Sequence, residues 1–261
     1  MRLDLYLTAQ SLAPSRTQAQ ELITGGFVRV NGREIRKVSF AVDENSPPAV
    51  EVVGKPHPYV GRGGMKLEGA LQSFGIDPCG MTCADIGAST GGFTDCLLQH
   101  GASRVFAVDS GSDQLDPSLR ADSRVVNIEH FNARNLTAET FGCLCDLAVA
   151  DLSFISQTYV LGNIASVLKP YGIYFGLIKP QFEFGPAALD KRGIVRSPAE
   201  HASAIRRVRD EAYSHSLIMR RIIGSPIRGG DGNREFLCLC VHSEKREEPV
   251  PDRVILELVR S

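Results

Sequence analysis

The stretch Ala84-Asp85-Ile86-Gly87-Ala88-Ser89-Thr90-Gly91-Gly92-Phe93-Thr94 decides the fold of this chain. Apolar residues up to Ile86 predict a buried strand, the glycines that follow predict a turn, and a helical pattern runs from Gly92 to His100. Strand, glycine turn and helix in this order are typical of a cofactor-binding βα unit in an α/β sheet. An ordinary strand-to-helix turn is the alternative, because similar turns occur in sheets that bind no cofactor.

A second apolar segment, Val105–Val108, ends at Asp109, where a carboxylate can bind the diol of a ribose. The dinucleotide fingerprint needs a second glycine two positions after the first, so that the backbone can approach a pyrophosphate. This chain has Ser89 at that position. The turn therefore favours a cofactor without phosphates, S-adenosyl-L-methionine (SAM), with Asp109 on its ribose and the backbone near Gly87 and Gly91 on its amino-acid tail.

Composition predicts a folded globular chain. Its 261 residues are 43% apolar, which suffices for a large core. No apolar run approaches the roughly 18 residues that cross a bilayer, and the N-terminus, with Arg2 and Asp4 flanking Leu3, lacks the apolar core of a signal peptide. We therefore expect a cytoplasmic protein with no membrane partner.

The seven cysteines predict neither disulfides nor a metal centre. Cys143 and Cys145 are separated by one residue, as are Cys238 and Cys240, whereas common zinc sites space such ligands by two to four. An odd number of cysteines in a chain without an export signal indicates reduced thiols. We expect no metal.

The beginning of the chain predicts a helix followed by a hairpin. Ser15–Ile23 has a polar cap and an apolar stripe at helical spacing, and Gly25-Gly26 ends the helix. Phe27–Val30 alternates as a strand, Asn31-Gly32 is a typical hairpin turn, and Val38–Val42 alternates again as the return strand. The pattern predicts a small α+β unit.

A break in regular structure at Gly54–Pro58 separates this unit from the rest of the chain. We expect one domain over residues 1–59 and an α/β domain over residues 60–261. Alternating strands and helices in the second predict a parallel sheet with helices on both faces. Strands are expected at residues 83–86, 105–108, 125–128, 147–150, 173–178, 219–223 and 236–241, and helices at residues 66–74, 92–100, 157–168, 197–215 and 251–259.

The first unit resembles the S4 RNA-binding module in Arg2-Leu3-Asp4, Ser15-Arg16, Ala19, Leu22-Ile23, Gly26 and Val28–Gly32. Residues 1–42 carry six Lys and Arg against three Asp and Glu, which suits an anionic partner. In that module the second helix and the hairpin contact folded RNA, so the resemblance implies phosphate contacts. Arginines that only solubilise a small domain are the alternative. The candidate RNA-binding residues are Arg2, Arg16, Arg29, Arg33, Arg36, Lys37 and, from the second unit, Arg62.

Charged residues stand at the ends of three expected strands. Asp151 and Lys179 each follow a buried apolar run, and Glu235 precedes one. The carboxyl ends of parallel strands form the ligand crevice of an open α/β sheet, so Asp151 and Lys179 are expected beside the cofactor. Glu235 joins them if its strand is antiparallel to its neighbours. Taken singly, a charge at a strand end more often faces solvent.

With Lys66 these residues give the order Lys, Asp, Lys, Glu, which resembles the catalytic tetrad of FtsJ-like ribose 2′-O-methyltransferases. Over nearly its whole length the chain resembles the TlyA (hemolysin A) family of ribosomal RNA methyltransferases. The resemblance implies a Rossmann-like sheet that binds SAM, methyl transfer to a ribose 2′-hydroxyl of a cytidine, and ribosomal RNA or ribosomal subunits as partners. Its further markers are Arg62-Gly63-Gly64, Lys66-Leu67, residues 85–94, Asn132-Ala133-Arg134, residues 151–154, residues 179–183 and Asn233-Arg234-Glu235.

The resemblance also implies roles for individual residues, with Lys66, Asp151, Lys179 and Glu235 as the catalytic set. A ribose hydroxyl is a poor nucleophile that must lose its proton as it attacks, and a lysine accepts a proton only when its pKa falls from about 10.4 toward neutrality. Lys179 is therefore either the proton acceptor or the residue that orients the hydroxyl. The implied cofactor residues are Asp85, Gly87, Ser89, Gly91 and Gly92 at the methionine end, Asp109 at the ribose, and Asn132 and Ala133 near the adenine.

Two other classes of function are weighed against this one. A membrane-lytic protein should need a signal, a spanning segment or a basic amphipathic helix, none of which the sequence predicts. Leakage of liposomes would reveal such an activity. A noncatalytic RNA-binding protein could keep the same fold as a scaffold, but the complete set of four charged residues favours an enzyme, and calorimetry of SAM binding would distinguish the two.

Overall fold

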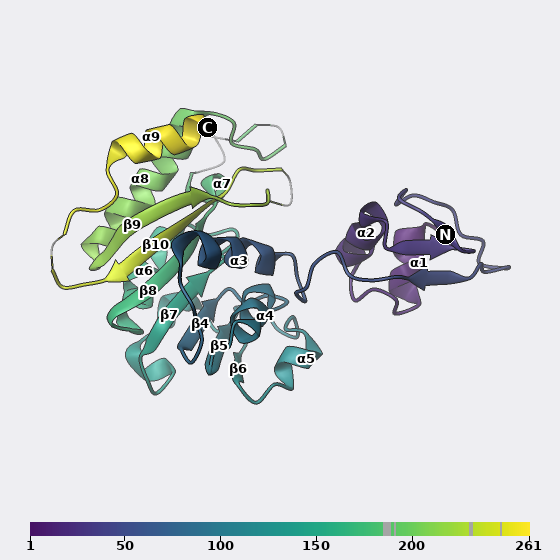
Figure 1. The fold of residues 1–261 in the computed structure, drawn as a ribbon, viewed down its shortest axis with the longest axis horizontal. Helices are drawn as coiled ribbons and strands as arrows, with labels where there is room; N and C mark the ends of the chain where they lie inside the picture. Colours follow the sequence, from purple (N-terminus) through teal and green to yellow (C-terminus); the bar gives the residue numbers. More distant parts are fainter. Residues whose placement is uncertain (185–188, 191, 230–231, 246) are drawn as a thin grey trace. The chain divides into compact units, whose positions relative to one another are not determined.

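The computed structural model describes residues 1–184, 189–190, 192–229, 232–245 and 247–261. These residues form two compact units, Met1–Pro58 and Tyr59–Ser261, drawn in Figure 1. The division lies one residue ahead of the expected boundary, because Tyr59 belongs to the same buried cluster as Leu67 of the second unit. Each unit has its own hydrophobic core.

The N-terminal unit consists of two helices and a three-stranded antiparallel sheet. Its second helix begins where the sequence predicts, because the Ser15 side chain accepts the backbone N–H of Gln18 at 3.3 Å, and the helix ends at Gly26. The core of this unit includes Ile23 and Val28. The elements are α1 (Leu3–Ala9), α2 (Arg16–Gly25), β1 (Val28–Val30), β2 (Arg33–Glu34) and β3 (Val50–Val52), with the strands in the order β2-β1-β3.

The return strand expected at residues 38–42 is wrong. The tight Asn31-Gly32 turn has positive φ at both residues, so the chain reverses at once and β2 pairs with β1. Residues 38–42 contribute only an isolated bridge at Ala41, and Val42 is buried in the core. The other neighbour of β1 is β3, which the alternation in the sequence did not predict.

The second unit is an α/β domain with a seven-stranded sheet in the order β6-β5-β4-β7-β8-β10-β9, which confirms the expected fold class. Both faces of its central strands are apolar and buried, as in sheets that lie between two layers of helices. The strands are β4 (Thr82–Ile86), β5 (Arg104–Val108), β6 (Val125–Ile128), β7 (Cys145–Ala150), β8 (Leu168–Ile178), β9 (Leu217–Gly224) and β10 (Phe236–His242). The helices are α3 (Gly63–Phe74), α4 (Gly92–Gln99), α5 (Pro117–Arg120), α6 (Leu161–Ser166), α7 (Pro180–Glu183), α8 (Pro198–Ser214) and α9 (Asp252–Arg260), with short 3-10 helices η1 (Ala133–Asn135), η2 (Ala138–Thr140) and η3 (Gln157–Tyr159).

The sheet is not wholly parallel, which corrects the expectation from the sequence. Strand β10 is antiparallel to both of its neighbours, β8 and β9. Its first residue, Phe236, therefore pairs with Ile178, the last residue of β8. This register brings Glu235, just before β10, to the same edge of the sheet as Lys179, just after β8.

Helices cover both faces of the sheet, as Figure 1 shows. One core packs α6, α8 and α9 against one face, and the other packs α3, α4 and α5 against the opposite face. The helix expected at residues 157–168 is shorter, because Leu168 already pairs with Cys145 in the sheet and Pro170 cannot continue a helix. None of the helices within the described ranges is long and apolar enough to cross a membrane.

Candidate active site

The glycine turn after β4 lies at the carboxyl edge of the sheet. Gly87 has a φ of 85°, a backbone conformation that residues other than glycine rarely adopt. The backbone N–H groups of Gly87 and Ala88 both donate to the carbonyl of Val108, at 2.8 and 3.0 Å. A Cβ atom on Gly87 would lie 3.1 Å from the carbonyl oxygen of Asp151. The turn thus brings the ends of β4, β5 and β7 together.

A cavity of about 390 Å³ opens at this edge. Asp109 lies in its wall, where its Oδ2 accepts the backbone N–H of Ser89 at 2.8 Å and its Oδ1 accepts that of Gly111 at 2.7 Å. Apolar side chains also line the cavity. They are Val108, Phe131, Leu152, Phe154, Ile155 and Val160.

Five of the eight cofactor residues expected from the sequence line this larger cavity. They are Gly87, Ser89, Asp109, Asn132 and Ala133. Gly92 instead lines a second, smaller cavity, whereas Asp85 and Gly91 line neither.

Asp85 is fully buried behind the glycine turn. Its Oδ2 accepts the hydroxyl of Thr94 at 2.7 Å, and its Oδ1 has no hydrogen-bond partner within the described part of the chain. Burial raises the pKa of this carboxyl to about 7, and the negative charges of Asp151 and Asp109 act in the same direction. Through this hydrogen bond to Thr94, Asp85 links β4 to α4 across the turn.

Gly91 has a structural role at the start of α4, where it is the N-terminal cap with a φ of 94°. A Cβ atom there would lie 2.3 Å from Cδ1 of Leu119 and 2.8 Å from Cδ1 of Leu115. Glycine is needed because α5 and the segment before it pack tightly against the turn. The sequence could not separate this packing role from ligand binding.

The four residues of the expected catalytic set converge from four separate segments. Lys179 Nζ lies 2.6 Å from Oδ1 of Asp151, and Lys66 Nζ donates to Oε2 of Glu235 at 2.7 Å. Lys66 Nζ is also 3.9 Å from Oδ2 of Asp151, so the two ion pairs form one chain of charges. Both lysines and Glu235 are buried, and Asp151 is partly exposed.

The smaller cavity, of about 210 Å³, lies beside this chain of charges. Lys179 lines it, whereas Lys66 and Glu235 do not. The two cavities meet, because they share a set of wall residues. The shared residues are Gly87, Ser89, Asp151 and Ser153.

Two site residues were not identified from the sequence. Ser153 accepts a hydrogen bond of 2.8 Å from Lys179 Nζ and lies in the wall of both cavities. Phe154 is 92% exposed, has a φ of 64° and packs its ring against Phe182, with 5.2 Å between ring centroids. Both belong to a segment that carries the family resemblance, and the position of Ser153 two residues after the strand-end Asp151 was the available signal.

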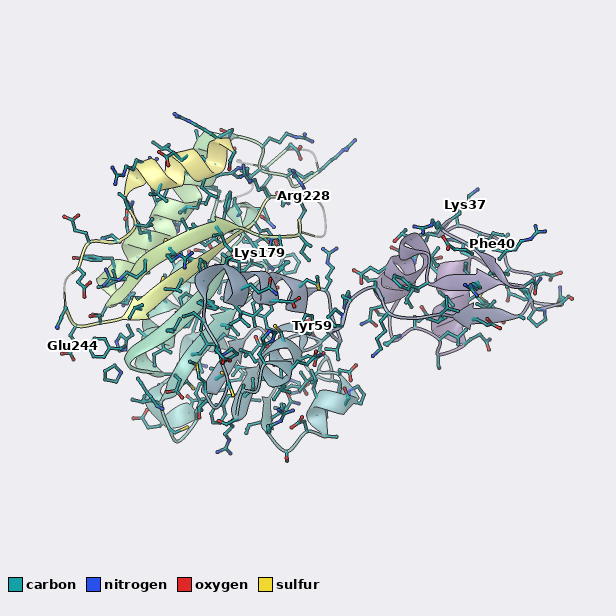
Figure 2. The ribbon with its side chains drawn as sticks, viewed as in Figure 1. Lys37, Phe40, Tyr59, Lys179, Arg228 and Glu244 are labelled. Carbon is teal, nitrogen blue, oxygen red and sulfur yellow. The ribbon has the colours of Figure 1, made fainter. Side chains whose placement is uncertain are left out.

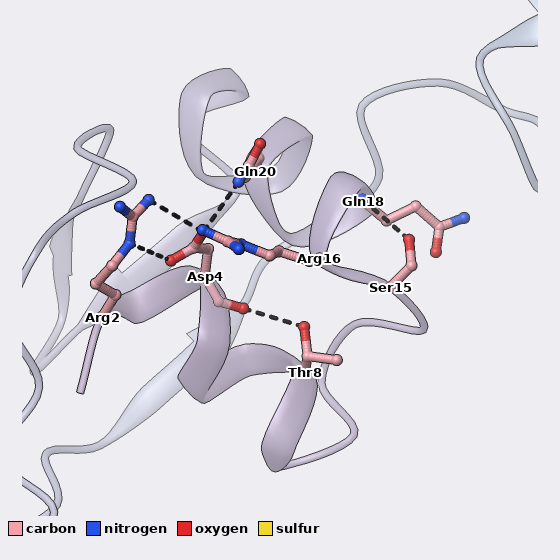
Figure 3. A network of polar contacts seen from close by, with 7 residues as sticks. All are labelled: Arg2, Asp4, Thr8, Ser15, Arg16, Gln18 and Gln20. Atoms are coloured by element: carbon pink, nitrogen blue, oxygen red, sulfur yellow. Dashed lines mark hydrogen bonds and ion pairs between the residues drawn. The ribbon is translucent and has the colours of Figure 1, made fainter.

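The candidate RNA-binding residues have different surroundings. Arg2 and Arg16 both donate to the buried carboxylate of Asp4, which also accepts from Gln20 (Figure 3). The hydrogen bond from Arg2 holds the pKa of Asp4 well below its usual range, although burial opposes the shift. Both arginine side chains stay about half exposed, at 45% and 53%.

The remaining basic residues of this set lie on the N-terminal unit or, in one case, at the smaller cavity of the second unit. Arg36 donates to Glu34 at 2.5 Å and to the carbonyl of Thr24 at 3.3 Å. Arg62 lines the smaller cavity of the second unit. Arg29, Arg33 and Lys37 are exposed on the first unit, and Figure 2 labels Lys37 there.

Comparison with known proteins places this fold and site in a known class. Residues 59–240 match the FtsJ-like methyltransferase family and residues 1–46 match the S4 domain. The chain belongs to the FtsJ-like methyltransferases and, through relatives that match nearly its full length, to the TlyA (hemolysin A) family. The family resemblance inferred from the sequence is confirmed.

Three relatives define this likeness. The 16S/23S rRNA (cytidine-2′-O)-methyltransferase TlyA of Mycobacterium tuberculosis is 42% identical over 238 residues, which cover 90% of this chain and 87% of the relative. Hemolysin A of Brachyspira hyodysenteriae is 41% identical over 242 residues, which cover 91% and 98%. A solved structure titled "Putative hemolysin from Streptococcus thermophilus" has a TM-score of 0.80 at 36% identity and covers 100% of this chain and 94% of that one.

Proposed function

We propose that this protein transfers a methyl group from SAM to a ribose 2′-hydroxyl of ribosomal RNA, with cytidine as the target nucleoside. The observation that carries the proposal is the position of Lys179, held between Asp151 and Ser153 where the two cavities meet. Relatives named as ribosomal RNA (cytidine-2′-O)-methyltransferases supply the substrate class.

The larger cavity suits SAM in size and chemistry. Its volume of about 390 Å³ is in the range of small-ligand sites, and many of its wall residues are apolar, as an adenine ring requires. Asp109 would hold the ribose diol, Asn132 and Ala133 would lie near the adenine, and the turn at Gly87 and Ser89 would bind the methionine end. SAM supplies an electrophilic methyl group when it is bound.

The smaller cavity would hold the ribose of the target nucleotide. Lys179 reaches it from the end of β8, and its Nζ is fixed in direction by Asp151 and by Ser153. A group fixed in this way either takes the proton of the 2′-hydroxyl or aims the hydroxyl oxygen at the methyl group. In either role Lys179 contributes mainly in the transition state, which raises the rate more than the affinity.

The N-terminal unit would supply most of the RNA affinity. Arg2 and Arg16 share one buried carboxylate, so the group of three keeps a net positive charge and a fixed geometry that suits a phosphate. Filter binding tests this assignment. Arg16→Ala should lower the slope of log affinity against log salt concentration by about 1 and leave SAM affinity unchanged.

The deciding experiment identifies the methylated atom. The purified chain is incubated with labelled SAM and with ribosomal subunits that lack the modification, and the RNA is digested to nucleosides for mass spectrometry. A methyl group on the ribose of cytidine is expected, and Lys179→Ala serves as the inactive control. A methyl group on a base would contradict the proposed reaction.

A further inference from the structure

Glu183 is a buried carboxylate that lines neither cavity, and its side chain is held by two hydrogen bonds. Glu183 is only 2% exposed. The hydroxyl of Ser156 donates to its Oε2, and the backbone N–H of Gln157 donates to its Oε1 at 3.1 Å. Burial raises the pKa of the Glu183 carboxyl, and these two donors oppose the shift. A carboxylate this costly to bury needs a reason beyond packing.

The hydrogen bonds of Glu183 join the two segments that carry the reactive groups. Ser156 follows Asp151 by five positions in the segment after β7, and Glu183 follows Lys179 by four in the segment after β8. Lys179 Nζ itself contacts Asp151 at 2.6 Å across the same gap. The two segments are therefore tied twice, once at the reactive end and once at Glu183.

Gln157 and Glu183 each make a further hydrogen bond to the rest of the domain. The side chain of Gln157 donates to the carbonyl of Leu177 in β8 and accepts the hydroxyl of Tyr174 at 2.6 Å. On the other side, Arg207 of α8 donates to the backbone carbonyl of Glu183 at 2.8 Å. Through these hydrogen bonds Glu183 fixes the segment that starts with Lys179 relative to β8 and α8.

We propose that Glu183 is a positioning residue that sets the place of Lys179 relative to Asp151 and Ser153. The inference rests on the proposed function and deepens it, because the reaction depends on where Lys179 Nζ points. A displacement of about 1 Å at a reacting group can lower a rate about 100-fold. Glu183 lines neither of the two cavities of the site, so substrate affinities should change little when it is replaced.

The test compares three substitutions of Glu183 in the full chain. Glu183→Ala removes both hydrogen bonds and should lower kcat by about 10- to 100-fold, with KM for RNA and Kd for SAM within about twofold of wild type. Glu183→Asp keeps the charge but shortens the side chain, so it should lose kcat as well. Glu183→Gln can accept from Gln157 and donate to Ser156, and it should restore kcat to within about threefold of wild type.

Asp146→Ala is the matched control, because it should destabilise the protein without moving Lys179. Asp146 is also a carboxylate that ties neighbouring strands, since it accepts the backbone N–H of Thr82 at 3.0 Å and pairs with Lys169 at 2.7 Å. It lies at the start of β7, away from the carboxyl edge of the sheet. This variant should lower the melting temperature and keep the wild-type kcat.

Wild-type kcat in Glu183→Asp and Glu183→Ala would overturn the inference, as would a Glu183→Gln variant as inactive as Glu183→Ala. Crystal structures provide a readout that is independent of activity. In Glu183→Ala the distance between Lys179 Nζ and Asp151 Oδ1 should exceed the native 2.6 Å by more than about 0.5 Å, and in Glu183→Gln it should be unchanged. An inactive wild-type chain would refute the proposed function, and the same two distances would still decide the role of Glu183.

Discussion

Lys66 on α3 donates a hydrogen bond of 2.7 Å to Glu235, although 169 positions separate the two residues in the sequence. Both side chains are buried, at 6% and 2% exposure, so the charge of each is compensated by the other and not by water. The two lysines of the site differ in their surroundings. Lys66 contacts Glu235 at 2.7 Å and Asp151 at 3.9 Å and does not line the smaller cavity, whereas Lys179 does.

Replacement of Lys66 should therefore harm stability more than replacement of Lys179. Lys66→Ala leaves Glu235 buried without its partner, which we expect to lower the free energy of unfolding by about 3–5 kcal/mol. Urea denaturation followed by circular dichroism measures the loss. The double variant Lys66→Ala/Glu235→Ala should recover part of it, because no lone charge then remains, and a double variant less stable than Lys66→Ala would contradict this account.

Lys179→Ala should lose most of the methylation rate while it keeps the affinities for SAM and RNA, because Lys179 acts mainly in the transition state. Lys179→Arg separates its two roles. A guanidinium stays protonated and cannot accept a proton, although it can orient a hydroxyl. Single-turnover rates of both variants decide: equal loss indicates a proton acceptor, and substantial rescue by arginine indicates an orienting group. An unchanged rate in Lys179→Ala would remove Lys179 from the site.

The sequence predicted the parts of the site that depend on local pattern. The turn at Gly87 and the strand-end positions of Asp151 and Lys179 follow from apolar runs and a glycine turn, and the sheet places them at one edge. The position of Glu235 could not be derived in this way. An apolar run predicts a strand after it, but the direction of that strand depends on pairing with β8.

Roles that depend on packing were also beyond the sequence. Gly91 and Asp85 belong to the same motif as Gly87, yet one meets the side chains of α5 and the other is buried with Thr94. The return strand of the hairpin failed for a similar reason. The alternation of residues 38–42 reflects a loop whose Val42 enters the core, and period-two burial alone does not require strand pairing.

Asp109→Ala should weaken SAM binding and leave RNA binding unchanged. The carboxylate would take charge-assisted hydrogen bonds from the ribose diol, each worth about 1.5–3 kcal/mol, so Kd should rise at least tenfold. Isothermal titration calorimetry measures it. Asp113→Ala is a matched control on the same loop, because Asp113 is 86% exposed and absent from the cavity wall. Equal affinities in the two variants would reject the assignment of Asp109.

Asp85 should make the domain less stable as the pH rises. Its folded pKa of about 7 lies above the usual value near 4, so between these pH values the folded state holds a proton that the unfolded state has lost. The free energy of unfolding should therefore fall from pH 4 to pH 7 and level off above. Asp85→Asn keeps an acceptor for Thr94 and cannot ionise, so it should be the more stable protein at pH 8, by up to about 4 kcal/mol.

Urea unfolding of both proteins at pH 4.5, near the lower end of this window, and at pH 8, above its upper end, measures this difference. The other titrating groups are common to the two proteins and cancel in the comparison. Parallel pH profiles for the wild type and Asp85→Asn would show that the buried carboxyl is ionised in the folded state throughout this range.

Arg234 connects the C-terminal helix to the site, since it stands directly before Glu235 and donates to the carbonyls of Leu258 at 2.7 Å and Val259 at 2.9 Å. The last carbonyls of a helix have no partner within the helix, so Arg234 satisfies two groups at the end of α9. Arg234→Ala should cost about 1–3 kcal/mol of stability and increase hydrogen exchange in the last turn of α9 and at Glu235. Exposed Arg253 on the same helix gives the control Arg253→Ala, which should change neither quantity. Hydrogen exchange by mass spectrometry distinguishes the outcomes: faster exchange confined to α9, with the peptide around Glu235 unaffected, would mean that the helix end and the site are independent.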